Sequence, residues 1–280
     1  MSFGGHSPRK RFGQHWLRDE WVLDRILEAS DLGSDDRVLE VGPGRGALTE
    51  RLLGSAAAAV HAIELDRDLV SGLRDRFDQF RQFSLCEGDV LEVPLSLPDG
   101  QLATKIVANI PYNITGPLLE RLIGRLDRPI DPPYQRLVLL VQKEVAERIR
   151  ARPGASSFSA LSVRMQLLAQ CSSVCPVPPR CFQPPPNVQS EVIRLDPLPP
   201  EQRPDPLTCH RVERLLKQAF LARRKMLRNT LNVPQPLSEL ETITRQAGID
   251  LRQRPQEVAP SAWVKLARGL NQADSAASSS

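Results

Sequence analysis

The chain has 280 residues, 41% hydrophobic and 25% charged, with a formal net charge of +4, which is typical of a folded, soluble protein with one large domain or a large and a small one. No apolar run approaches the ~20 residues that cross a bilayer, and the N-terminus lacks the apolar stretch of a secretory signal. Five cysteines without a CxxC pair argue against a disulfide framework, so we expect a cytoplasmic protein that binds no membrane.

Strand and helix patterns alternate from residue 36 to about residue 143. Short apolar segments typical of buried strands are separated by helical patterns, one of them from about Leu69 to Phe80. Residues 158–170 also have helical spacing, whereas residues 171–195 contain proline-rich loops and a last strand, SEVIRL. Strands that alternate with helices predict an α/β, Rossmann-like fold with a parallel sheet covered on both faces. The expected strands before residue 144 are RVLEVG, AAVHAIELD, FSLCEGD, KIVANI and QRLVLLVQK.

A small C-terminal helical domain is predicted after the sheet. Residues 208–231 and 237–248 have helical spacing, and Gly248 suits the C-terminal cap of the second helix. The residues before this domain are rich in proline, which suits an extended linker, and the last residues are small and polar, which predicts disorder. The expected organisation is an α/β domain over 1–196, a linker over 197–206, a helical domain over 207–270 and a disordered tail over 271–280.

A glycine-rich turn follows the first expected strand. Gly42, Gly44 and Gly46 let the backbone turn sharply into a helix and approach a ligand closely. Their GxGxG spacing departs from the GxGxxG of dinucleotide binders, and Pro43 removes a backbone donor that a phosphate would need. Glu40, two residues before the first glycine, favours a ligand with a cationic group instead.

Two further acids end the next two expected strands. At these places Glu64 can accept hydrogen bonds from both hydroxyls of a ribose, and Asp89 can accept one from an adenine amino group. Because ligand sites in open α/β sheets lie at the carboxyl ends of the strands, we expect Glu40, Glu64 and Asp89 to face one crevice. The alternative is that each acid only caps a helix or a loop.

The segment NIPY, residues 109–112, follows a fourth expected strand. The lone pair of an adenine N6 is delocalised into the ring, so this amine is a poor nucleophile. The side-chain oxygen of Asn109 and the carbonyl of Ile110 could accept both N6 hydrogens and hold the lone pair toward an incoming methyl group. Tyr112 could stack on a flipped-out base, and Phe182 is the candidate for the opposite face of that base. An ordinary Asn-x-Pro turn and core packing of Phe182 are the structural alternatives.

Cations cluster in two stretches. The first eighteen residues carry four Lys or Arg and no acid, and residues 203–228 carry eight against two acids. Such clusters indicate a polyanionic partner or, with equal weight, a solvated helix face. Four of the cations lie within two turns of the expected helix over 208–231, namely Arg223, Arg224, Lys225 and Arg228.

Taken in order, these motifs closely resemble the bacterial small-subunit rRNA adenine dimethyltransferases, the kasugamycin-sensitivity enzymes. The match covers nearly the whole chain, and it rests on the order and spacing of the segments rather than on any one of them. His15 and Trp16 are variants of the Asn or His and the Phe that members often carry there. The matching segments are RKRFGQHWL (9–17), LEVGPGRGALT (39–49), AIELD (62–66), EGDVL (87–91), NIPYNIT (109–115), LLVQKEVAERI (139–149), FQPPPNVQSEVIRL (182–195) and FLARRKMLRNTL (220–231).

The resemblance implies an S-adenosylmethionine-dependent enzyme that dimethylates N6 of two adjacent adenines in the 3′-terminal hairpin of 16S rRNA, within the immature small ribosomal subunit. No general base is required, because sulfonium is an excellent leaving group and the methylated amine can lose its proton to water. Nothing demands more than a monomer. By matching position, the basic residues of 223–228 contact the rRNA backbone, and the cofactor is held by Gln14, His15, Leu17, Gly42, Glu64, Asp89 and Asn109.

Three other functions are open alternatives. The large-subunit rRNA adenine methyltransferase of the macrolide-resistance type shares the fold and the NIPY-type motif, but RFGQHWL and RRKMLRNTL favour the small-subunit type. A non-catalytic RNA-binding assembly factor would have no need of the intact glycine loop, and the glycine spacing disfavours a nicotinamide-dependent dehydrogenase. Cys171, Cys175 and Cys181 lack a CxxC pair and a nearby histidine, so no metal site is expected.

Overall fold

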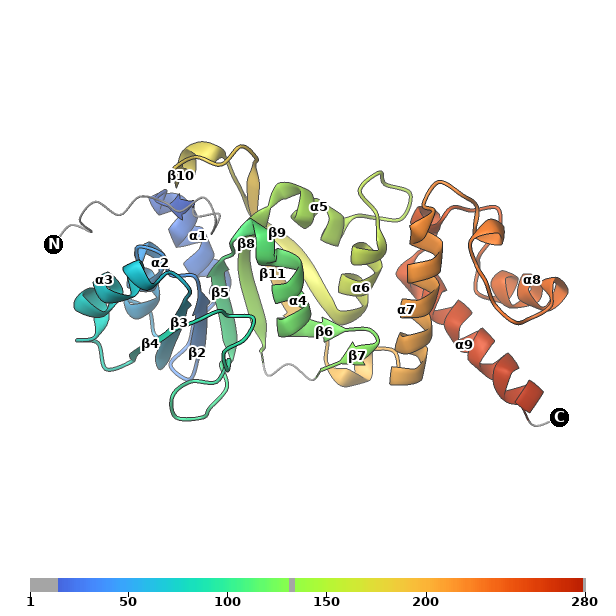
Figure 1. Ribbon diagram of the computed structural model, residues 1–280, viewed down its shortest axis with the longest axis horizontal. Helices are drawn as coiled ribbons and strands as arrows, with labels where there is room; N and C mark the ends of the chain where they lie inside the picture. The colour runs from blue at the N-terminus through green and yellow to red at the C-terminus, as the bar shows by residue number, and fades with distance from the viewer. Residues whose placement is uncertain (1–14, 131–133, 279–280) are drawn as a thin grey trace. The chain divides into compact units, whose positions relative to one another are not determined.

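The computed structural model describes residues 15–130 and 134–278 (Figure 1). Its contacts divide the chain into two compact units, of which the second takes residues 123–131, 147–170 and 198–280 and the first takes the rest. This division differs from the expected boundary at residue 196, because 147–170 contains a helix that packs with the C-terminal helices. Within the described residues, no helix combines the length and the apolar character needed to cross a bilayer.

A seven-stranded sheet forms the centre of the first unit, and it confirms the predicted Rossmann-like α/β fold. Five neighbouring strands of this sheet, β4, β3, β2, β5 and β8, run parallel, whereas β11 pairs antiparallel with β8. The parallel strands therefore all end at one edge, called the carboxyl edge below. In spatial order the strands are β4 (Phe83–Glu87), β3 (Ala59–Glu64), β2 (Arg37–Val41), β5 (Lys105–Asn109), β8 (Arg136–Gln142), β11 (Ser190–Pro197) and β9 (Ala169–Val177).

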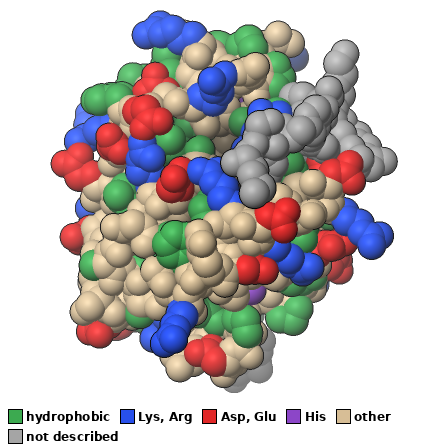
Figure 2. Space-filling model, turned by 90° about the vertical axis from the view of Figure 1, so that its left-hand side faces the viewer, with side chains coloured by type: hydrophobic (Ala, Val, Ile, Leu, Met, Phe, Trp, Pro, Cys, Tyr) green, Lys and Arg blue, Asp and Glu red, His purple; other side chains and the backbone are tan. Residues whose placement is uncertain are grey.

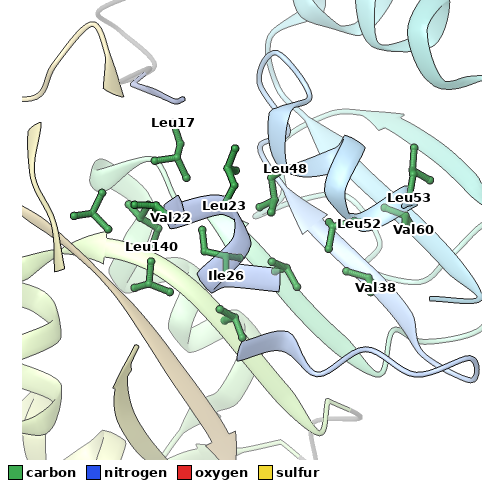
Figure 3. Close-up of a cluster of buried hydrophobic side chains, with 14 of the residues drawn as sticks. Leu17, Val22, Leu23, Ile26, Val38, Leu48, Leu52, Leu53, Val60 and Leu140 are labelled. Carbon is green, nitrogen blue, oxygen red and sulfur yellow. The ribbon is translucent and has the colours of Figure 1, made fainter. Parts of the chain in front are cut away.

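Helices α1 (Glu20–Ser30), α2 (Ala47–Leu53) and α3 (Arg67–Phe77) share one core with the sheet. Figure 3 shows side chains of α1 and α2 directed at strand residues such as Val38, Val60 and Leu140. The alternate strand residues, Leu39 and Leu139 among them, are also fully buried, as expected for parallel strands that are covered on both faces. Asp19 and Asp66 cap α1 and α3 by accepting backbone N–H groups, which fixes where these helices begin.

Strand β9 was not predicted, since its proline-containing sequence was expected to form a loop. The strand lies at the edge of the sheet, beside β11. An edge strand pairs on one side only, so it can tolerate Pro176, which has no backbone N–H to donate. A separate two-stranded pair joins β1 (Trp16–Leu17) to β10 (Phe182–Gln183) antiparallel. The chain also forms α4 (Thr115–Ile123), β6 (Gly124–Arg125), β7 (Arg128–Pro129) and α5 (Lys143–Arg150).

The second unit contains α6 (Ala160–Leu168), α7 (Pro206–Leu221), α8 (Leu237–Gln246) and α9 (Pro260–Ser278). Helices α6 and α7 both pack with α9, whose Trp263 is fully buried near the ring of Phe220. A two-pronged ion pair between Arg164 and the buried Glu213 joins α6 to α7.

Two predictions for the second unit need correction. The helix expected over 208–231 ends at Leu221, and its last residues form turns and the short 3-10 helix Leu227–Asn229. The tail expected to be disordered from residue 271 continues α9 to Ser278, since its alanines favour a helix even though its other residues are polar. Gly248 does stand just after α8 with a φ of 77°, as a C-terminal cap requires.

Candidate active site

A pocket of about 320 Å³ opens at the carboxyl edge of the sheet in the first unit. Its walls come from the ends of β2, β3, β4 and β5, together with His15 and Trp16 of the N-terminal segment. Gly42, Glu64, Asp89, Asn109 and Tyr112 all line this one pocket. The structure therefore brings together the residues that sequence reasoning placed at four separate strand ends.

The glycine loop packs closely under Trp16. Gly44 has a φ of 60°, and a Cβ atom added there would lie 3.0 Å from Cδ1 of Trp16. The guanidinium of Arg45 lies over the same indole ring, 3.9 Å from its centroid. Only glycine combines this backbone conformation with such a close approach, so Trp16 and the loop together form one wall of the pocket. Sequence reasoning had treated Trp16 only as a tolerated variant.

Backbone amides orient the carboxylate of Glu64. One oxygen accepts the N–H of Gly44 at 3.0 Å and the other accepts that of Asp66 at 2.8 Å. Burial raises the pKa of Glu64, and these two N–H donors oppose that rise. Each oxygen keeps a further lone pair, so the carboxylate can accept from two ligand hydroxyls while the loop holds it in place.

Of the two other acids predicted to face the crevice, Asp89 lines the pocket and Glu40 does not. Asp89 lines the pocket, and its Oδ1 accepts the N–H of Leu91 at 2.9 Å, so it is both a loop cap and a pocket residue. Glu40 is not among the lining residues, so the prediction that it faces the crevice is wrong. It points to the face covered by α2, where it accepts the hydroxyl of Thr49 at 2.7 Å, and burial raises its pKa to about 8.

The amide of Asn109 is oriented by the N-terminal segment. Its Nδ2 donates to the main-chain carbonyl of His15 at 3.1 Å. Because this bond occupies the amino side of the amide, Oδ1 is the atom left to accept from a ligand in the pocket. This is the atom that the chemistry of an adenine amine requires.

Tyr112 is held at two points. Its hydroxyl lies 2.6 Å from Oγ of Ser190, and its ring stacks on that of His15 at 5.8 Å and 24°. The Nδ1 of His15 lies 2.9 Å from the carbonyl oxygen of Pro184, which fixes the imidazole in turn. Sequence reasoning gave Ser190 no role, although the residue lies within the matching segment FQPPPNVQSEVIRL (182–195).

Two predicted site residues that the structure describes, Leu17 and Phe182, are not among the residues that line the pocket. Gln14 lies outside the described residues. Leu17 and Phe182 are paired across β1 and β10, and both are buried in the hydrophobic core, where Phe182 is 4% exposed. The stacking role predicted for Phe182 is therefore withdrawn in favour of core packing, the alternative weighed for it. Among the described residues, no group of three side chains could hold a metal ion.

The four predicted RNA-contacting cations lie in the second unit, after the end of α7. Arg223, Arg224 and Lys225 lie on a turn, and Arg228 lies in the 3-10 helix Leu227–Asn229. Arg224, Lys225 and Arg228 are exposed, whereas Arg223 is half-buried and its guanidinium donates to the carbonyl of Ser156. We call Arg224, Lys225 and Arg228 the basic turn. On the face of the molecule that Figure 2 shows, by contrast, basic side chains are scattered among acidic ones.

A Rossmann-like sheet with a GxGxG loop, a backbone-held acid at the next strand end and an NIPY segment in the same pocket defines an S-adenosylmethionine-dependent methyltransferase. Comparison with known proteins identifies the family to which this methyltransferase belongs. The family described as "Ribosomal RNA adenine dimethylase" matches residues 5–272. The chain therefore belongs to the ribosomal RNA adenine dimethylase family.

Similar proteins agree with this family. The ribosomal RNA small subunit methyltransferase A of Synechococcus sp. (strain WH7803) is 88% identical over 279 residues, which is 100% of both chains. That of Prochlorococcus marinus (strain MIT 9313) is 70% identical, covering 98% of both chains. A dimethyladenosine transferase from Plasmodium falciparum has a TM-score of 0.78 at 26% identity, covering 92% of this chain and 98% of its own. The 23S rRNA methyltransferase ErmE has a TM-score of 0.70 at 27% identity, covering 92% of this chain and 100% of its own.

Proposed function

We propose that this protein dimethylates N6 of two adjacent adenines in the 3′-terminal hairpin of 16S rRNA within the immature small ribosomal subunit. The observation that carries the proposal is the orientation of Asn109, whose Oδ1 is left to a ligand in the pocket that Glu64 and Asp89 also line. The relatives at 66–88% identity are named small subunit methyltransferases, which supports the choice of substrate.

The residues at the ends of β2, β3 and β4 are the proposed cofactor site. Glu64 would hold the ribose hydroxyls of S-adenosylmethionine, Asp89 its adenine, and the loop at Gly42 would approach it closely, under the wall formed by His15 and Trp16. Two backbone N–H groups already fix Glu64, so the binding site is largely preformed. When bound, the cofactor supplies an electrophilic methyl group on a sulfonium centre.

The NIPY segment is the proposed site of the target adenine. Oδ1 of Asn109 and the carbonyl of Ile110 accept the N6 hydrogens, which turns the nitrogen lone pair toward the methyl group. Tyr112 stacks on one face of the flipped base. No side chain has to remove a proton before transfer, because the amine loses it to water once it carries the new methyl group and a positive charge.

We further propose that the protein works as a cytoplasmic monomer and that the basic turn contacts the rRNA backbone. Duplex RNA is recognised largely through its shape and its phosphates, and exposed Arg and Lys side chains on a turn suit that role. The large-subunit alternative has one point in its favour, the fold shared with ErmE. The more similar relatives, and their names, outweigh it.

The decisive experiment offers the purified enzyme and labelled S-adenosylmethionine to small subunits isolated without the modification. We expect two dimethylated adenines in the terminal hairpin of 16S rRNA, identified by mass spectrometry of that fragment. Large subunits serve as the matched control and should stay unlabelled. Label only in 23S rRNA would favour the macrolide-resistance type, and no label with a folded protein would favour the non-catalytic assembly factor.

A further inference from the structure

Ser190 ties the ring of Tyr112 to the central sheet. It is the first residue of β11, it lies opposite Gln142 of β8 in the antiparallel register, and it is 1% exposed. Its Oγ is 2.6 Å from the hydroxyl of Tyr112. Because the strand ladder holds the backbone of Ser190, its hydroxyl is a fixed point on which another side chain can be anchored.

The strand ladder that holds Ser190 does not hold Tyr112. It begins the three-residue 3-10 helix Tyr112–Ile114, outside the sheet, and its ring is only half-buried. The ring also stacks on that of His15, which precedes the two-residue strand β1. The bond to Ser190 is therefore the tie between this ring and the central sheet, and it holds the hydroxyl end of the ring, which sets the direction of the ring axis.

Resting on the function proposed above, we propose that Ser190 is a positioning residue that fixes the ring of Tyr112 at the angle against which the target adenine stacks. A base stacked on a tilted ring carries its N6 away from Oδ1 of Asn109, and small misplacements of reacting groups slow a transfer markedly. We expect the effect mainly on the RNA substrate, because the two hydroxyls bond to each other and, among the described residues, neither has a bond to Gly42, Glu64 or Asp89.

Burial supports this assignment against a merely structural one. Partial burial raises the pKa of Tyr112 above its ordinary value, and a protonated phenol at neutral pH keeps both hydroxyls available for the bond. A buried serine whose only role was to satisfy its own hydroxyl would affect the stability of the fold. It would not be coupled to Tyr112 in catalysis.

A double-mutant cycle separates the two roles. Ser190→Ala, Tyr112→Phe and the double variant are assayed with small subunits that lack the modification. We expect each single change to lower kcat/KM for the subunit about three- to tenfold, the effect of one hydrogen bond, and the double variant to be no slower than the slower single variant. The Kd for S-adenosylmethionine stays within twofold of wild type in all three.

Ser30→Ala is the matched control, since Ser30 is a fully buried serine of the first unit whose Oγ donates to the carbonyl of Ile26 at 2.7 Å. It should turn over subunits like wild type. Normal turnover of Ser190→Ala, effects that multiply in the double variant, or an equal loss of cofactor affinity would overturn the proposal. If Ser190→Ala does not fold, Tyr112→Phe breaks the same bond from the other side, and normal turnover then overturns it. A wild-type enzyme inactive on these subunits would instead overturn the proposed function.

Discussion

The side-chain amide of Asn109 donates to the main-chain carbonyl of His15, although 94 residues separate the two in sequence. The bond decides which end of the amide can meet a ligand. It also makes the N-terminal segment part of the acceptor site, because the residue that gives this carbonyl lines the same pocket. We therefore expect the N-terminal segment and the amide of Asn109 to position the target adenine together.

Replacement of Asn109 by Ala should lower kcat at least about 100-fold, since it removes a positioned dipole that acts in the transition state. His15→Ala is the informative comparison, because it keeps the main-chain carbonyl and removes only the imidazole stacked on Tyr112. We expect a far smaller loss there. Single-turnover transfer to small subunits measures both, with circular dichroism to verify folding. Near-normal turnover of Asn109→Ala would refute its role.

Gly44→Ala should weaken binding of S-adenosylmethionine about tenfold, because the new Cβ meets the ring of Trp16 and a φ of 60° strains any L residue by roughly 1–2 kcal/mol. Gly116→Ala is the matched control. Gly116 lies in α4, and its added Cβ would meet no atom within 4 Å, so that variant should be neutral or slightly stabilised. Titration calorimetry and thermal unfolding measure the pair. Equal cofactor affinity in both variants would exclude the role given to the loop.

Arg224→Gln combined with Lys225→Gln should weaken binding to the small subunit and reduce the salt slope of log Kobs by about 1.5, if each cation meets one phosphate. Arg74→Gln combined with Arg81→Gln removes the same charge from exposed positions of the first unit and should leave the slope unchanged. Filter binding over a range of salt concentrations compares them. A slope that is the same in both double variants would place the RNA contact elsewhere.

Glu40→Gln should stabilise the protein near neutral pH. The folded chain holds a proton on Glu40 up to about pH 8, whereas the unfolded chain releases it near 4.5, so wild-type stability falls as the pH rises between these values by at most about 1.4 kcal/mol per unit. Glutamine carries no such charge and can still meet Thr49. The difference between the two unfolding free energies should therefore vanish below pH 4.5, grow up to pH 8 and then stay constant. Denaturant titrations across this range test it, and a pH-independent difference would contradict it.

Much of the pocket could be predicted from local patterns. Buried strands are apolar over five or six residues, so the sequence shows where each one ends and which polar residue follows it. Parallel strands end at one edge, and this rule alone brings Gly42, Glu64, Asp89 and Asn109 together. No comparable rule says which face of its strand Glu40 occupies. It lies two residues after Val38 and shares the face that α2 covers.

Sequence patterns did not predict the contacts between segments that are far apart along the chain. Residues 222–228 are rich in good helix formers, but α7 ends at Leu221, and the N–H groups of Leu227 and Arg228 donate to the distant carbonyls of Gln253 and Leu251 instead of continuing that helix. Phe182 faces the core because β10 pairs with β1, and Ser190 reaches Tyr112 because β11 is in register with β8. The sequence by itself determined the parallel strands, the residue at which each one ends and the chemistry gathered at those ends, since these follow from short-range periodicity. The tertiary structure decided which side chains face the pocket, which pack in the core and which hold others in place, because those depend on pairings between residues far apart along the chain.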